Sequence, residues 1–123
     1  GSGAPFAGRA ALVVEDEAII SLMIEDMMRA LGFAPVWLAA SVPQALAILE
    51  RERPDAAVLD VNVGRDFVYP AAERLEMLGV PFVFATGYGR SGIPTHWATV
   101  PTIQKPFGQD ELLSALKRAL SKS

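Results

Sequence analysis

Short apolar runs alternate with segments of helical periodicity along this chain, and that alternation restricts the fold more than any other feature. Five runs have the composition of buried strands, at residues 12–14, 36–39, 56–60, 82–85 and 100–104. Between them, apolar residues recur at the three- and four-residue spacing of amphipathic helices. Strands that are repeatedly followed by helices predict a parallel sheet covered on both faces, with right-handed crossovers.

The helices are predicted from apolar spacing together with start and stop signals. Ser41 and Gln44 have the form of a capping box, and Gly32 and Gly79 are plausible helix stops. The predicted helices cover residues 20–31, the stretch from residue 41 to a break at residue 54, residues 70–78 and residues 108–120. Residues 86–94 contain three glycines and a proline, which disfavour a sustained helix. The fourth helix of the alternation is therefore expected to be short or missing.

The composition predicts one ordered domain with a large core, since 51% of the 123 residues are hydrophobic and 20% are charged. Cysteine is absent, which excludes disulfides, thiolate metal sites and thiol catalysis and agrees with a cytoplasmic protein. A formal net charge of -3 without a basic stripe argues against nucleic-acid binding. No apolar run approaches the roughly 20 residues that span a bilayer. We therefore expect no association with nucleic acid or membrane.

The first residues are expected to lie outside this domain. Gly1, Ser2 and Gly3 resemble the remnant of a cleaved tag, and the same sequence would suit a disordered start. We assign residues 1–8 to that segment and residues 9–123 to the domain.

Polar residues stand at the ends of four predicted strands. Glu15 and Asp16 follow the first strand, Asp60 ends the third, Thr86 follows the fourth and Lys105 follows the fifth. In doubly wound sheets the functional crevice lies beyond the carboxyl ends of the strands. The predicted fold therefore brings these five side chains to one edge of the sheet.

The acidic residues among them predict a divalent cation. Three carboxylates in one crevice repel one another unless a cation lies between them, and all-oxygen ligands favour Mg²⁺. We expect Asp16 and Asp60 to bind Mg²⁺ directly, Glu15 to act through water, and the backbone carbonyl of Asn62 to complete the set.

The remaining two residues point to phosphoryl chemistry. Neither Lys105 nor Thr86 is needed to hold a divalent cation, but a positive charge and a hydroxyl together suit a phosphoryl group. A carboxylate nucleophile can form an aspartyl phosphate while a metal and a lysine neutralise the transferring oxygens. Asp60 is the predicted nucleophile.

Four ordered motifs resemble the receiver domain of bacterial two-component response regulators, and the similarity covers residues 9–120. Residues 13–17 (Val-Val-Glu-Asp-Glu) resemble the acidic metal-binding turn of that family, and residues 58–60 (Val-Leu-Asp) its phosphoacceptor strand. Residues 84–87 (Phe-Ala-Thr-Gly) resemble the switch-hydroxyl segment, and residues 105–107 (Lys-Pro-Phe) a signature that usually carries a cis peptide before the proline.

The resemblance implies a flavodoxin-like fold, a doubly wound five-stranded parallel sheet of strand order 2-1-3-4-5. It also implies that a phosphohistidine on a sensor kinase or phosphotransfer domain donates to Asp60, and that Thr86 then turns inward to contact the phosphoryl group. Signalling would follow from a changed surface and not from turnover, so the chain is not expected to be an enzyme. The downstream protein is unknown, and a monomer or weak dimer is expected.

Three features depart from the usual family pattern. An aromatic residue commonly stands three positions before the lysine, but Thr102 occupies that position here. Residues 62–66 (Asn-Val-Gly-Arg-Asp) replace the commoner Met-Pro pair and later glycine. Residues 84–89 (Phe-Ala-Thr-Gly-Tyr-Gly) resemble a receiver subgroup of alphaproteobacterial stress signalling with a remodelled fourth helix. The aromatic switch is therefore absent or relocated.

Other interpretations stay open at this point. The domain could be free-standing, a phosphate shuttle, or a receiver excised from a hybrid histidine kinase. It could also be an unphosphorylated pseudo-receiver that only binds partners. A haloacid-dehalogenase-like phosphohydrolase is a distant alternative, because that family expects an aspartate where this chain has Asn62.

Overall fold

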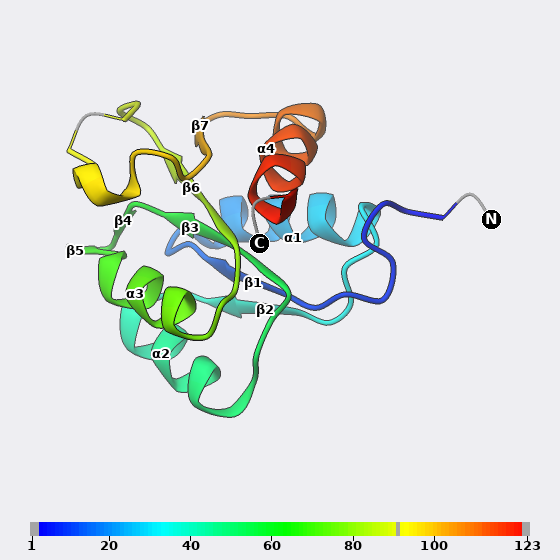
Figure 1. Cartoon of the computed structure of the whole chain (residues 1–123), viewed down its shortest axis with the longest axis horizontal. Helices are drawn as coiled ribbons and strands as arrows, with labels where there is room; N and C mark the ends of the chain where they lie inside the picture. Colours follow the sequence, from blue (N-terminus) through cyan, green and yellow to red (C-terminus); the bar gives the residue numbers. More distant parts are fainter. Residues whose placement is uncertain (1–2, 91, 122–123) are drawn as a thin grey trace.

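The computed structural model describes residues 3–90 and 92–121 and contains one five-stranded parallel sheet (Figure 1). The strands are β1 (Ala11–Val14), β2 (Val36–Ala39), β3 (Ala56–Asp60), β6 (Phe82–Thr86) and β7 (Thr102–Gln104), in the order β2-β1-β3-β6-β7. The helices are α1 (Ala18–Ala30), α2 (Val42–Arg51), α3 (Tyr69–Met77) and α4 (Gln109–Ser121). The predicted doubly wound α/β fold and its strand order are confirmed.

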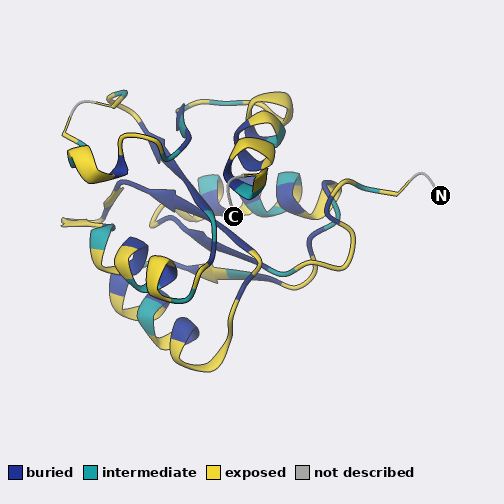
Figure 2. Cartoon of the chain, viewed as in Figure 1, coloured by how far each residue is buried: buried dark blue, intermediate teal, exposed yellow. Residues whose placement is uncertain are grey.

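Two cores lie on opposite faces of the sheet because successive strand residues point to opposite sides. Leu12 and Leu59 belong to the core beneath α2 and α3, whereas Val13 and Val58 belong to the core beneath α1 and α4. Figure 2 shows the central strands β1, β3 and β6 buried along their length and the helices buried on their inward faces. Continuous apolar strands are what a sheet covered on both faces requires.

The helix signals act as the sequence predicts. The hydroxyl of Ser41 accepts a hydrogen bond from the backbone N–H of Gln44 at 3.2 Å, and the Gln44 side chain accepts from Ala40 at 2.8 Å. At the start of α4, the backbone N–H of Gly108 donates to Glu111 Oε1 at 3.0 Å. These bonds satisfy N–H groups that a helix start leaves without partners.

The connection between β6 and β7 contains only a 3₁₀ helix, η1 (Thr95–Trp97), in its described part. The expected shortening of the fourth helix is therefore confirmed. Sequence analysis missed a second feature, a small antiparallel hairpin of β4 (Asn62–Val63) and β5 (Asp66–Phe67) directly after β3. Gly64 lies at its turn with a φ of 65°, a conformation that favours glycine.

Phe6 lies before the expected domain start at residue 9 and packs on the fold. Phe6 is buried and stacks on Phe33 with ring centroids 5.0 Å apart. Its backbone N–H also donates to the carbonyl of Leu31 at 2.9 Å. Burial of an aromatic ring stabilises this segment against the domain. The described part of the first eight residues is thus packed on the fold, while residues 1–2 lie outside the described residues.

The described helices also bear on the membrane prediction. None of them is both long enough and apolar enough to cross a bilayer.

Candidate functional site

The strand register brings the predicted site residues to one edge of the sheet. Val14 is paired with Leu59, so Glu15 and Asp60 stand side by side just beyond the same level of β1 and β3. Asp60 is paired in turn with Ala85, directly before Thr86. On the far side, the backbone N–H of Lys105 donates to the carbonyl of Thr86 at 2.8 Å. Backbone pairing alone therefore places the site, as expected for the carboxyl edge of a doubly wound sheet.

Three carboxylates converge at this edge. Glu15, Asp16 and Asp60 each offer one oxygen within 4.8 Å of the others. Glu15 and Asp60 are buried, with 1% and 6% of their surface exposed, whereas Asp16 is exposed. The structure thus brings together the three acidic residues that the sequence singled out for a metal.

Lys105 lies between the two buried carboxylates. Its Nζ is 3.0 Å from Glu15 Oε1 and 3.3 Å from Asp60 Oδ2. The Lys105–Pro106 peptide is cis, as the family signature predicts. Burial lowers the pKa of Lys105, but the hydrogen bond to Glu15 and the charges of Asp60 and Glu15 outweigh burial and raise this pKa above its ordinary value. The lysine is therefore a permanent positive charge of the site.

Asp60 has a pKa raised from 3.8 to about 6. Burial is the largest cause, and the charge of Glu15 adds to it, while Lys105 acts in the opposite direction without cancelling them. A carboxylate that is costly to ionise favours a further cation beside it.

The oxygens of Glu15 are already engaged. Oε1 accepts from Lys105, and Oε2 accepts from the backbone N–H of Glu17 at 2.9 Å. Asp16, by contrast, makes no hydrogen bond or ion pair with any described residue and projects at the surface. The three carboxylates fit a hard divalent cation, and the 3.0 Å contact with Glu15 orients Lys105. Direct binding by Asp16 and Asp60, and binding by Glu15 through water, remain predictions. Asn62 is exposed at the start of β4, so its carbonyl remains a predicted ligand.

Thr86 is buried at the end of β6, and its hydroxyl is bound within its own loop. Its Oγ1 accepts from the backbone N–H of Tyr88 at 3.0 Å. Tyr88 itself is 78% exposed, whereas Trp97, farther along the same connection, is fully buried at 1% exposure.

Arg90, which no sequence pattern predicted as a functional residue, crosses the described part of the β6–β7 connection. Its Nη1 donates to Thr102 Oγ1 and to the carbonyl of Val100, and its Nη2 donates to the carbonyls of Trp97 and Ala98 at 3.0 and 2.9 Å. A lone arginine in a glycine-rich segment, with a threonine where an aromatic residue is usual, is the sequence signal that could have indicated this contact.

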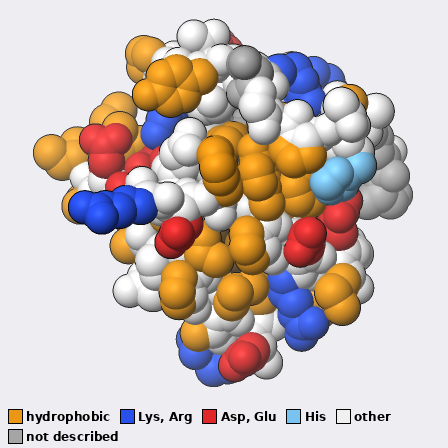
Figure 3. All heavy atoms as spheres, turned by 90° about the vertical axis from the view of Figure 1, so that its left-hand side faces the viewer, with side chains coloured by type: hydrophobic (Ala, Val, Ile, Leu, Met, Phe, Trp, Pro, Cys, Tyr) orange, Lys and Arg blue, Asp and Glu red, His pale blue; other side chains and the backbone are white. Residues whose placement is uncertain are grey.

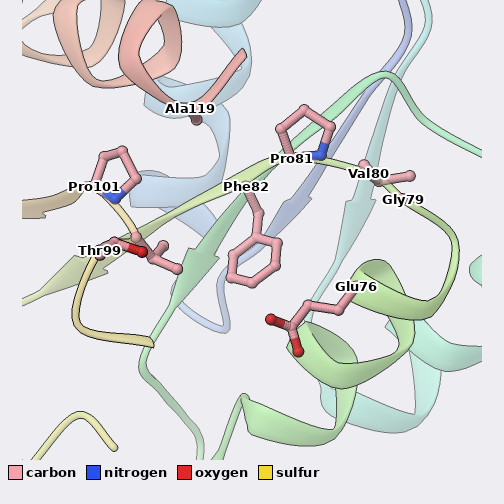
Figure 4. Close-up of a pocket in the computed structure, with 9 residues that line it drawn as sticks. Glu76, Gly79, Val80, Pro81, Phe82, Thr99, Pro101 and Ala119 are labelled. Atoms are coloured by element: carbon pink, nitrogen blue, oxygen red, sulfur yellow. The ribbon is translucent and has the colours of Figure 1, made fainter. Parts of the chain in front are cut away.

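The hollows that touch the site, of about 280 and 270 Å³, are smaller than others in the molecule. A groove of about 400 Å³ lies at the opposite end of the sheet, where β6 and β7 begin. Phe82, Pro101 and Ala119 line it (Figure 4), and Glu76 is the charged residue on its rim. None of the predicted site residues belongs to this groove.

Comparison with known proteins identifies the family. No family model matches the chain. The solution structure of SdrG from Sphingomonas melonis Fr1 is 40% identical, covering 91% of this chain and 96% of that one, with a TM-score of 0.81. The receiver domain of the sensor histidine kinase PA1611 from Pseudomonas aeruginosa PAO1 is 30% identical, covering 94% and 99%, with a TM-score of 0.79. The chain belongs to the receiver-domain family of response regulators.

The curated relatives of this receiver domain include a phosphotransferase and two transcriptional regulatory proteins. It is 29% identical to sporulation initiation phosphotransferase F of Bacillus subtilis, over 89% of this chain and 91% of that protein. It spans 58% of the length of the mycobacterial regulators that it also matches, at 27% identity. The sequence-based assignment to a signalling family is confirmed.

Proposed function

We propose that Asp60 accepts a phosphoryl group from a phosphohistidine of a sensor kinase or phosphotransfer protein, and that this receiver domain then signals through a changed surface. The observation that carries the proposal is the pair of buried carboxylates with Lys105 between them. The three converging carboxylates carry more negative charge than Lys105 neutralises, so the cluster suits a divalent cation. Such a cation, together with Lys105, can then offset the negative charge of an arriving phosphoryl group.

The reaction moves one phosphoryl group. An oxygen of the Asp60 carboxylate attacks phosphorus, the bond from phosphorus to the donor's imidazole nitrogen breaks, and its electron pair remains on that nitrogen. The carboxylate is the attacking form of Asp60; burial raises its pKa to about 6 in the absence of a metal, and a cation bound beside it favours the ionised form. Lys105 is close enough to Asp60 to neutralise the phosphoryl oxygens afterwards.

Asp16, Asp60 and the Asn62 carbonyl are the groups that we expect to hold Mg²⁺. When bound, this ion supplies positive charge that stabilises the transferring oxygens. The PA1611 receiver domain has a magnesium ion in its active-site cleft, which supports the same ion here. Glu15 holds Lys105 in place through its 3.0 Å bond.

Thr86 is the proposed switch residue. Its hydroxyl oxygen accepts from the backbone N–H of Tyr88, and we expect the side chain to leave that bond when its O–H turns to donate to a phosphoryl group on Asp60. The exchange is favourable because a hydrogen bond to a charged oxygen is about twice as strong as one between neutral groups.

The partner would dock on an apolar surface of α1, next to the three carboxylates of the site. Ile19, Leu22 and Met23 are 75%, 54% and 56% exposed, which is unusual for three large apolar residues on one helix. A neighbouring hollow is lined by Asp16, Leu22 and Leu38, so the apolar surface is continuous with the acidic site. This surface fits an apolar helix that carries the donor histidine, and the similarity to a phosphotransferase supports that class of partner.

The proposal includes a cytoplasmic setting and a signalling role without turnover of an external substrate. The cysteine-free sequence is compatible with that compartment. A phosphohydrolase of the haloacid-dehalogenase type is disfavoured because Asn62 cannot serve as its second acid.

The test is incubation with Mg²⁺ and a small phosphodonor, followed by intact-mass measurement. We expect the mass gain of one phosphoryl group, lost on mild alkali treatment and absent from the Asp60→Asn variant. Asp66→Asn is the matched control, because Asp66 is exposed on the nearby hairpin, and it should be phosphorylated normally. Folded protein that never gains the phosphoryl group would support a pseudo-receiver, and steady release of phosphate from simple esters would support a hydrolase.

A further inference from the structure

Arg90 makes an unusual set of contacts for an arginine at the surface. All four of its hydrogen bonds go to one short stretch of chain, from Trp97 to Thr102, and three of them end on backbone carbonyls. No described carboxylate lies within ion-pair distance of its guanidinium. The guanidinium group is planar and rigid, so each of its two terminal nitrogens can bind two separate acceptors at the same time. The single ammonium group of a lysine cannot bind acceptors that lie so far apart. The side chain therefore acts as a clamp across the β6–β7 connection.

The clamp links the loop after Thr86, which lies beside the site, to η1, which is anchored in the core by Trp97. Arg90 lies four residues beyond Thr86, whose hydroxyl accepts from Tyr88 in the same loop. At its other end, the clamp holds η1, whose Trp97 ring is buried against Tyr69 and Phe84 at centroid distances of 5.1 and 5.7 Å. Thr102 is paired with Phe84 across β6 and β7, so the clamp also reaches the edge strand.

A second contact supports the same segment. The hydroxyl of Tyr69 donates to the carbonyl of Gly92 at 3.2 Å, and the Tyr69 ring stacks on the exposed ring of Phe67 at 5.4 Å. Figure 3 shows hydrophobic side chains gathered at the centre of the face on which the hairpin and η1 lie. A displacement of η1 would therefore change the exposed surface of the molecule on this face.

We propose that Arg90 is a positioning residue that carries the movement of Thr86 to η1 and β7. This inference rests on the proposed function. When Thr86 breaks its hydrogen bond with Tyr88, the Arg90 guanidinium shifts. Because that guanidinium is bonded to the carbonyls of Trp97, Ala98 and Val100, these carbonyls move with it. The tightly packed aromatic cluster around Trp97 cannot deform continuously, so we expect it to change between two distinct arrangements when the loop moves slightly. The output of Asp60 phosphorylation is then read on the η1 surface.

Trp97 provides the measurement. Its Nε1 is buried and has no acceptor among the described residues, so its indole N–H signal should report a change in packing. The chain has two tryptophans, and a Trp37→Phe variant assigns the two indole signals. The experiment records ¹H–¹⁵N spectra of the full chain with Mg²⁺, before and after addition of beryllofluoride as a phosphoryl analogue.

In the wild type we expect the amides of Thr86 and Lys105 and the indole of Trp97 all to shift. In Arg90→Gln, Thr86 and Lys105 should shift as before, while the Trp97 shift is lost. Arg90→Lys should restore only part of it, and Arg65→Gln, which changes an exposed arginine on the nearby hairpin turn, should leave it intact. Circular dichroism verifies the fold of each variant.

Four results would overturn the inference. A full Trp97 shift in folded Arg90→Gln would show that the clamp transmits nothing. A wild type in which Thr86 and Lys105 respond but Trp97 does not would show that η1 stays in place. Absence of any response at Lys105 in the wild type would reject the proposed function itself, and the inference with it. If Arg90→Gln does not fold, Thr102→Val, which removes one acceptor of the clamp, should still diminish the Trp97 shift, and an unchanged shift there also rejects the inference.

Discussion

The strand-end cluster and the β6–β7 connection lie side by side but are held by different means. The strand-end cluster consists of Glu15, Asp60 and Lys105. The parallel register of the sheet brings them together, and Lys105 Nζ lies 3.0 and 3.3 Å from the carboxylate oxygens of Glu15 and Asp60. The β6–β7 connection, in its described part, is tied by the hydrogen bonds of Arg90 to carbonyls. Single hydrogen bonds contribute only about 1 kcal/mol each. We therefore expect the cluster to stay in place and the connection to be the part that rearranges.

The largest effect should come from removing the charge of Lys105. Lys105→Met leaves the developing charge on the phosphoryl group without its protein cation, so phosphorylation from a small donor should slow by about 100-fold, as for loss of one oxyanion contact. The rate is measured by intact mass over time with Mg²⁺ present. Arg90→Gln, the matched change in the connection, should leave this rate within about threefold of wild type, since it touches no reacting atom. Equal slowing by both variants would contradict the division into fixed and movable parts.

A gain in stability is expected when Asp60 loses its charge. The folded pKa of about 6 exceeds the ordinary value of 3.8, so the folded state holds the proton more tightly and loses stability as the pH rises between those values. Without metal, the free energy of unfolding of Asp60→Asn should equal that of the wild type near pH 3.8. Above a pH of about 6 it should exceed the wild-type value by about 1–3 kcal/mol.

Urea unfolding in EDTA across this pH range measures the difference. Mg²⁺ should reduce the difference in free energy of unfolding between Asp60→Asn and the wild type, because it stabilises the folded wild type and binds the variant less well. A gap that is constant with pH would mean that the Asp60 carboxylate is not destabilised in the fold.

A third change isolates the repulsion between the two buried acids. Glu15→Gln removes the negative charge beside Asp60, so the pKa of Asp60 should fall below about 6 toward its ordinary value. The side-chain carbon signal of Asp60 in metal-free protein reports this titration. A pKa that stays near 6 would assign the whole shift to burial.

The smallest effect concerns the connection alone. Arg90→Gln should reduce the free energy of unfolding by about 1–2 kcal/mol, since the four hydrogen bonds it removes lie near the surface and water replaces part of them. Urea unfolding at neutral pH measures the loss, with Arg65→Gln as the near-neutral control. A loss as large as that of a buried aromatic truncation, about 3–5 kcal/mol, would make the clamp part of the rigid core instead.

The same two regions differ in how well the sequence predicted them. Asp60 and Lys105 were predictable because a residue that ends or follows a parallel strand must lie at one edge of the sheet, whatever the loops do. The capping pair of Ser41 and Gln44 was predictable because both partners lie in one helical turn. These are consequences of local spacing.

Features that depend on contacts between distant segments were missed. Phe6 packs on Phe33, and nothing in the first eight residues signals a partner so far along the chain. The clamp of Arg90 depends on where a glycine-rich loop turns, and two-residue strands such as β4 and β5 are too short for an alternating pattern to reveal them. Thr102 was recognised as a departure, but its partner was visible only in the structure.

The central claim is that Asp60 is the phosphoacceptor, and chemical trapping tests it most directly. Protein incubated with Mg²⁺ and a small phosphodonor is treated with borohydride, which reduces an aspartyl phosphate to homoserine, and the peptides are then sequenced by mass spectrometry. We expect homoserine at position 60, while Asp16 and Asp66 remain aspartate. Homoserine at another position, or none in protein whose Lys105 amide responds to beryllofluoride, would contradict it.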